Sequence, residues 1–144
     1  MTCGAGHGVS GSETGTAMPI ASDADVIVCS RRAQCMAEGF GFEGGTAADI
    51  ATAVAEIARN IVVHAKRGDI SIAPVSVADR TGIEIRAEDS GPGISDIATA
   101  MKDGFTTGRS LGIGLAGARR LMDEFEIASP PGGGTTVTMR KWLP

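Results

Sequence analysis

The chain is 144 residues long, the usual size of one domain, and this length predicts a single hydrophobic core. Thirteen basic and seventeen acidic residues give a net charge of −4, which argues against a nucleic acid as the main partner. Three cysteines lie at no zinc-like spacing, and no apolar run is long enough for a signal core or a membrane span. These features indicate a reduced, soluble, cytoplasmic protein with no membrane partner.

The first part of the chain differs in composition from the rest. Residues 1–22 are rich in glycine, serine and threonine, which cannot bury enough apolar area to offset backbone ordering. They predict a flexible tail, and residues 23–144 predict the folded domain. At the start of that domain, the β-branched run Asp25–Val28 predicts a strand and Arg31–Glu38 a helix that stops at the following glycine.

A long helix is predicted from Thr46, a capping residue, to near Gly68, with apolar residues recurring at spacings of three and four. A polar turn over residues 78–82 joins two strand-like runs and predicts an antiparallel hairpin. Helices mixed with such strands predict an α+β fold, a two-layer α/β sandwich whose helices cover one face of a mixed, mostly antiparallel sheet. The remaining predicted elements are strands at 70–77 and 83–88, a helix at 94–102, a loop at 104–111, a helix at 113–125, and strands at 126–128 and 135–142.

Glu56 and Asn60 are four residues apart on the predicted long helix, so their side chains project from one face. An amide oxygen can coordinate Mg²⁺, and a nearby carboxylate can accept a proton from an attacking hydroxyl. Taken alone, the pair is better explained as two solvated residues at the edge of the apolar stripe, where polar residues are common. The chemistry therefore depends on what lies beside the pair.

A second cluster, Asp89–Gly93, follows a predicted strand directly. It places an acid at the end of the strand, and its two glycines permit a tight turn close to a ligand. A carboxylate in this position can accept a hydrogen bond from an exocyclic amine such as that of adenine. The alternative is a turn that only closes a hairpin, because these residue types favour turns.

A third cluster, Gly112–Gly117, matches the pattern G-x-G-x-x-G. A dinucleotide-binding fold is excluded because a polar loop precedes the pattern, and a valine in a predicted strand stands where the ribose-binding acid is expected. The sequence also lacks a P-loop. Glycines that open a helix still expose backbone N–H groups and the positive end of the helix dipole, which suits phosphate oxygens.

In this order, the clusters resemble the GHKL (Bergerat-fold) superfamily of ATPases and kinases. Glu56–Asn60 resembles the N-box, and Asp89–Gly93 resembles the first glycine box. Gly108–Gly114 resembles the ATP lid with the second glycine box, and Gly134–Thr135 resembles the terminal Gly-Thr element. The resemblance spans nearly the whole predicted domain, and it implies a Bergerat ATP-binding sandwich.

The resemblance also implies ATP and Mg²⁺ as cofactors, with Glu56 as the catalytic base on the acceptor hydroxyl. Asn60 would hold Mg²⁺, and Asp89 would bind the adenine amine. Arg109 either reaches phosphates or is only solvated. The other implied nucleotide-binding residues are Gly91 and Gly93 near adenine and ribose, Thr106, Thr107, Gly108, Gly112 and Gly114 near the phosphates, and Thr135.

Within the superfamily, three segments resemble the RsbT-type serine/threonine switch kinases that regulate anti-sigma factors in bacterial stress signalling: Glu56–Asn60, Asp103–Thr107 and Arg120–Phe125. The resemblance implies transfer of the γ-phosphate of ATP to a serine or threonine of a STAS-domain antagonist. Release would then activate a PP2C-type phosphatase in a partner-switching, stressosome-linked pathway. Two alternatives stay open: an anti-sigma factor that sequesters a sigma factor and uses nucleotide as a conformational cofactor, and a domain that has lost ATP binding. A weak homodimer is compatible with each of them.

Overall fold

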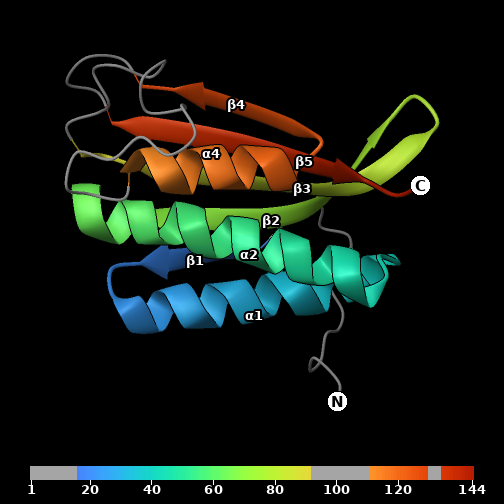
Figure 1. The fold of residues 1–144 in the computed structure, drawn as a ribbon, viewed down its shortest axis with the longest axis horizontal. Helices are drawn as coiled ribbons and strands as arrows, with labels where there is room; N and C mark the ends of the chain where they lie inside the picture. The colour runs from blue at the N-terminus through green and yellow to red at the C-terminus, as the bar shows by residue number, and fades with distance from the viewer. Residues whose placement is uncertain (1–15, 92–110, 130–133) are drawn as a thin grey trace.

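The structure, a computed structural model, describes residues 16–91, 111–129 and 134–144. Figure 1 shows two layers, with the helices on one face of a single sheet. The sheet order is β1-β2-β3-β5-β4, and each of its four neighbouring pairs is antiparallel. The elements in chain order are β1 (Thr16–Ile20), α1 (Asp23–Phe40), α2 (Gly44–Asn60), the π-helix η1 (Ile61–Ala65), β2 (Gly68–Val77), β3 (Arg80–Asp89), α4 (Leu111–Leu121), β4 (Glu124–Ala128) and β5 (Thr135–Trp142).

The hydrophobic core lies between the helices and the sheet. Buried and more exposed side chains alternate along the central strands, because successive side chains of a strand point to opposite faces of the sheet. Ile70 and Ile72 of β2 are fully buried, and so are Ile83 and Ile85 of β3, whereas the residues between them are more exposed. Burial of each such side chain contributes about 1.5–3 kcal/mol. From the helical layer, the apolar stripe of α2 is buried against them, with Ile50, Val54 and Ile57. The predicted α+β two-layer sandwich is confirmed.

The predicted N-terminal tail is wrong for residues 16–22, and residues 1–15 lie outside the described residues. Thr16–Ile20 form β1, which pairs antiparallel with β2 at the edge of the sheet. Met18 and Ile20 point into the core, and the intervening Pro19 is exposed, which an edge strand tolerates because one side of its backbone has no partner strand. The glycine-rich composition of the surrounding segment concealed this two-residue alternation.

The strand predicted at Asp25–Val28 is wrong, because these residues belong to α1. Ser22 caps the helix by accepting from the Asp25 N–H at 3.3 Å, and Asp25 reaches back to the Ala21 N–H at 2.9 Å. This reciprocal pair resembles a capping box and satisfies two backbone donors at the helix start. Local capping and packing against α2 therefore override the β-branched residues of the segment.

The long central helix is confirmed, but its ends differ from the prediction. It begins at Gly44 with Glu43 at the N-cap position, so Thr46 lies inside the first turn. After Asn60 the backbone widens into η1, which closes with a hydrogen bond of 2.8 Å from the Lys66 N–H to the Ile61 carbonyl. Lys66 has a positive φ of 77°, which departs from helical geometry and ends the helix. π-Helical turns are rare and occur frequently at functional sites.

The predicted hairpin is confirmed, with a shorter turn than expected. Val77 pairs with Arg80, so only two residues connect the strands, and one of them, Ala78, has a φ of 57°. The helix predicted at 113–125 is α4, which ends at Leu121, and Phe125 lies in β4. The helix predicted at 94–102 and the loop residues 104–110 lie outside the described residues. Of the helices in the described part of the chain, none combines the length and apolar character needed to cross a membrane.

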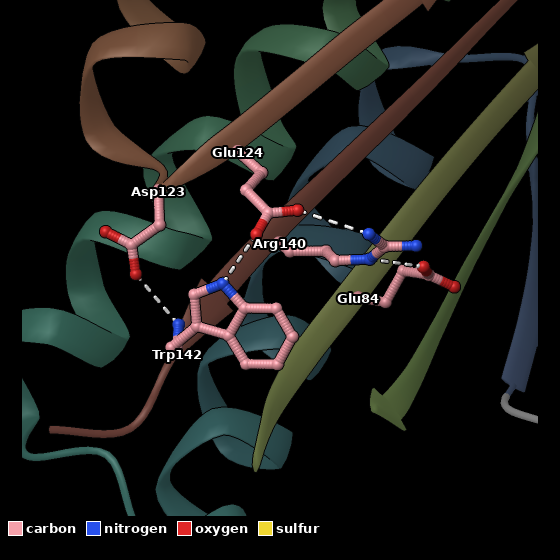
Figure 2. Close-up of polar contacts among 5 residues, drawn as sticks. All are labelled: Glu84, Asp123, Glu124, Arg140 and Trp142. Carbon is pink, nitrogen blue, oxygen red and sulfur yellow. Dashed lines mark hydrogen bonds and ion pairs between the residues drawn. The ribbon is translucent and has the colours of Figure 1, made fainter. Parts of the chain in front are cut away.

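The face of the sheet opposite the helices carries a polar network (Figure 2). Arg140 of β5 donates from Nε to Glu84 of β3 at 2.8 Å and from Nη1 to Glu124 of β4 at 3.1 Å. The Trp142 indole N–H donates to the other oxygen of Glu124 at 2.8 Å. The guanidinium of Arg80, which Figure 2 does not draw, lies 4.3 Å from the centroid of the indole ring. The network thus joins the C-terminal strand to both of its neighbours.

The hydrogen bonds from Trp142 and Arg140 to Glu124 hold the pKa of this carboxyl below its ordinary value of 4.5. Because the pKa of Glu124 is lower in the folded state, its ionised carboxylate stabilises the fold fully above about pH 4.5. This stabilisation is lost as the pH falls through the folded-state pKa. We expect wild-type stability to fall more steeply below about pH 4.5 than that of Glu124→Gln. Urea unfolding at a series of pH values, followed by the fluorescence of the single tryptophan, measures this. Parallel pH profiles for the two proteins would contradict the prediction.

Candidate functional site

The C-terminal half of α2 presents Glu56 and Asn60 at the border between the core and solvent. The neighbouring Ile57 and Ala58 are buried and hold the helix against the sheet. The Glu56 side chain is 34% exposed and forms an ion pair of 3.4 Å with Arg59. Asn60 is half-buried, and its Nδ2 atom has no hydrogen-bond partner among the described residues although it is buried. A buried amide without a partner is unusual and suggests that a ligand completes this position.

The π-helix that follows Asn60 packs against the Asp89 turn. A Cβ added to Gly91 would lie 2.7 Å from the Ala65 Cβ, so the backbone of the turn rests on the last residue of η1. At the other end of η1, Ile61 lies beside Gly68, and a Cβ on that glycine would be 3.1 Å from Ile61 Cγ2 and 3.0 Å from Asp89 Cβ. The end of the long helix and the end of β3 are therefore in contact, which places Asn60 and Asp89 at the same end of the molecule.

Asp89 itself is the last residue of β3, and its carboxylate is held by the glycine turn. Its Oδ1 accepts a hydrogen bond of 2.8 Å from the Gly91 N–H. Within the described part of the chain, no donor reaches Oδ2. The half-buried carboxylate is thus oriented through one oxygen and keeps the other for an external donor such as an amine.

The Gly134–Thr135 element lies directly beside Asp89. Thr135 pairs with Asp89 in the β3–β5 ladder, and its hydroxyl is 2.9 Å from the Ser129 hydroxyl. Gly134 has a φ of +86°, and a Cβ there would collide with the Asp89 carbonyl oxygen. Only glycine allows this close approach of the two backbones. The tertiary structure therefore brings the terminal element to the end of β3.

The glycines of the third cluster, Gly112, Gly114 and Gly117, all lie in α4. Gly112 and Gly114 lie in its first turn, because α4 begins at Leu111, two residues before the predicted start, and α4 runs beside α2 (Figure 1). Gly93 and the predicted phosphate-side residues Thr106, Thr107, Gly108 and Arg109 lie outside the described residues.

A hollow of about 600 Å³ opens at the same end of the sheet, where β1 ends and β2 begins. Asp89, Ser90 and Gly68 are among the residues that line it, whereas Glu56 and Asn60 are not. The hollow thus borders the Asp89 turn on the β1 side and is distinct from the α2 side of the candidate site.

Sequence reasoning missed the residues that join the two halves of the site, Ile61, Ala65 and Gly68. The sequence feature that pointed to this region was the glycine at the expected end of the long helix. It predicted where the helix stops but not that these residues contact the Asp89 turn. The ion pair of Arg59 with Glu56 was also missed, although the i, i+3 spacing of the two residues permits it.

Comparison with known proteins identifies the family of the chain. Residues 21–141 match the model of the histidine kinase-like ATPase domain. The chain belongs to this family. Its relatives include the serine/threonine-protein kinase RsbT of Bacillus subtilis (strain 168), 43% identical over 124 residues, which are 86% of this chain and 93% of that protein.

Other members of the family are more distant. The anti-sigma F factor of Caldanaerobacter subterraneus subsp. tengcongensis is 39% identical over 101 residues, covering 67% of this chain and 70% of that protein. The anti-sigma F factor of Thermoanaerobacter sp. (strain X514) is 38% identical over 100 residues, with the same coverage of 67% and 70%. The family assignment implies that the chain uses ATP.

Proposed function

We propose that this chain is an ATP-dependent serine/threonine protein kinase of a partner-switching pathway, and that its acceptor is a serine or threonine of a STAS-domain antagonist. The observation that carries the proposal is the packing of η1 on the Asp89 turn, which gathers Glu56, Asn60 and Asp89 at one end of the sandwich. The match to RsbT over most of both chains supports the same reaction.

Each residue of the proposed site has a role that follows from the chemistry of its side chain or backbone. Glu56, partly exposed at the end of α2, accepts the proton of the acceptor hydroxyl as that oxygen attacks. Asp89 accepts a hydrogen bond from the adenine amine through Oδ2, because Oδ1 is bonded to the turn. The backbone N–H groups around Gly112 and Gly114 at the start of α4 bind phosphate oxygens. The residues on the phosphate side, Thr106, Thr107, Gly108 and Arg109, with Gly93 and Thr135, complete the proposed nucleotide site.

Asn60 fits a role beside magnesium and phosphate. Its amide group is buried at Nδ2 without a partner among the described residues, and rotation of the amide would present the oxygen instead. No group of three His, Cys, Asp or Glu side chains in the described ranges has a metal-binding arrangement, so phosphate and water oxygens would supply most of the ligands. When bound, Mg²⁺–ATP provides the phosphoryl group and neutralises the charge that develops on it.

The pathway proposed for this kinase follows from the resemblance of its sequence to the RsbT-type switch kinases. Phosphorylation of the antagonist releases the kinase, which then activates a PP2C-type phosphatase in a bacterial stress response. We place this activity in the cytoplasm, where ATP and such partners are available. A second candidate is an anti-sigma factor, because relatives with that name match two thirds of the chain at 38–39% identity.

One experiment separates these functions. The purified protein is incubated with γ-labelled ATP, Mg²⁺ and each STAS-domain protein of its host, and transfer of label is measured. We expect label on a serine or threonine of one of them. A stable stoichiometric complex with a sigma factor, without transfer to any STAS-domain protein, would instead establish the second candidate. Absence of ATP binding by calorimetry would exclude both nucleotide-dependent functions.

Asp89→Asn is expected to weaken ATP binding by about 10- to 100-fold, because it removes one charged hydrogen-bond acceptor for the adenine amine. The fold should be retained, since an asparagine oxygen can still accept from the Gly91 N–H. Calorimetric titration with ATP and Mg²⁺ measures the affinity, and thermal unfolding measures the stability. Asp79→Asn, at the exposed hairpin turn, is the matched control. Unfolding of Asp89→Asn, or unchanged affinity, would count against the assigned role.

A further inference from the structure

Arg59 lies directly beside the proposed catalytic base. Its Nη1 is 3.4 Å from Glu56 Oε1, and this is its only ion pair among the described residues. The Arg59 side chain is 47% exposed, so a second partner can reach it from solvent. A charge-assisted hydrogen bond is typically about 2.7–2.9 Å long, so this pair is loose and is easily exchanged for a better partner.

Arg59 also lies on the surface that an acceptor must approach. Thr52, Glu56, Arg59 and Val63 follow one another at spacings of four, three and four, and so form one outward stripe along α2 and η1. Thr52 is exposed, and Val63 is 41% exposed. An acceptor segment whose hydroxyl reaches Glu56 therefore covers Arg59 in the next turn of the same face.

Covering Arg59 has an energetic consequence. A guanidinium removed from water without full pairing is strongly destabilising, and Glu56 must keep a free oxygen for the acceptor proton. The guanidinium has five N–H donors, so it can stay close to Glu56 and still bind a second carboxylate through two of them. The docked acceptor must then supply that carboxylate.

We propose that Arg59 is a specificity-determining residue, which selects acceptor serines or threonines that have an aspartate or glutamate close to the hydroxyl. The inference rests on the proposed kinase function and on Glu56 as its base. It adds the chemical class of the acceptor site: a hydroxyl next to a carboxylate. A basic acceptor segment is excluded by repulsion from the same guanidinium.

Steady-state kinetics with the STAS-domain protein that the wild-type kinase phosphorylates tests this inference. We expect Arg59→Gln to raise the KM for the acceptor by about two- to fivefold and to leave the KM for ATP unchanged. Charge reversal in Arg59→Glu should raise the acceptor KM by about tenfold or more, since two like charges then face each other. Arg59→Lys should restore part of the loss, because it keeps the charge without the two-donor geometry. Arg119→Gln, on the exposed side of α4, is the matched control and should behave as wild type.

A substitution in the acceptor protein provides the second part of the test. Neutralising the acidic residue nearest to its phosphorylated hydroxyl should raise KM with the wild-type kinase and have no further effect with Arg59→Gln. An unchanged acceptor KM in Arg59→Gln, with wild-type transfer intact, overturns this inference and leaves the kinase function standing. A rise only in the KM for ATP also overturns it, because Arg59 would then be a nucleotide contact. Failure of the wild-type protein to phosphorylate any STAS-domain protein overturns the proposed function, and this inference with it.

Discussion

Glu56→Gln is expected to lower kcat for phosphoryl transfer by about 10²- to 10⁴-fold, the usual contribution of a general base. The substitution keeps the size and hydrogen-bonding capacity of the side chain but removes its ability to accept a proton. Because Glu56 is one-third exposed and its only described ion pair is loose, the stability of the fold should change by less than about 0.5 kcal/mol. Transfer of label from γ-labelled ATP to the STAS-domain acceptor measures the rate.

The affinity for ATP distinguishes a base from a nucleotide contact. It should be the same in wild type and Glu56→Gln, because the carboxylate acts on the acceptor hydroxyl. Glu38→Gln, an exposed glutamate of α1, serves as the matched control and should keep full activity. If Glu56→Gln transfers phosphate at the wild-type rate, another group removes the proton and the proposed mechanism is wrong.

Gly134→Ala is expected to destabilise the protein by at least about 2 kcal/mol, a large effect for the addition of one methyl group. The residue has a φ of +86°, where a Cβ is strained, and that Cβ would collide with the backbone carbonyl of Asp89. Neither atom can move without shifting the β3–β5 pairing at Asp89 and Thr135. ATP binding should therefore weaken together with stability, because Asp89 would be displaced.

Gly45→Ala provides the contrast. This glycine lies in the first turn of α2, where an added Cβ meets no heavy atom within 4 Å. Its replacement should stabilise the protein by about 0.5–1 kcal/mol, the difference between glycine and alanine in a helix. Urea unfolding measures both variants, and calorimetry measures their ATP affinity. A midpoint for Gly134→Ala equal to that of wild type would show that the close approach to Asp89 is not required.

Local patterns in the sequence were sufficient to predict much of the fold and to place the candidate site residues on their helix and strand. The buried stripe of α2 follows from apolar residues at spacings of three and four, and the β2–β3 hairpin from two strand-like runs around a polar turn. The positions of Glu56 and Asn60 on one helix face follow from the helical period alone. Asp89 at a strand end followed from the strand pattern and the two glycines after it. Each of these features depends on residues close together in the chain.

Other features depended on partners that are distant in the sequence. β1 forms because β2 offers an edge to pair with, and the β-branched start of α1 is helical because Ser22 and Asp25 cap it and α2 covers it. The tendency of such residues to form strands yields to burial and capping, since strand preference depends strongly on context.

What the sequence by itself determined is which candidate groups the chain carries, because an acid, an amide and an aspartate followed by a glycine turn are fixed as residue types at fixed spacings. What only the tertiary structure decided is that these groups lie at the same end of the molecule. The π-helical turn after Asn60 carries Ala65 onto Gly91, and the left-handed Gly134 lets β5 approach Asp89. These contacts join segments far apart in the chain through close backbone packing, which no local pattern specifies.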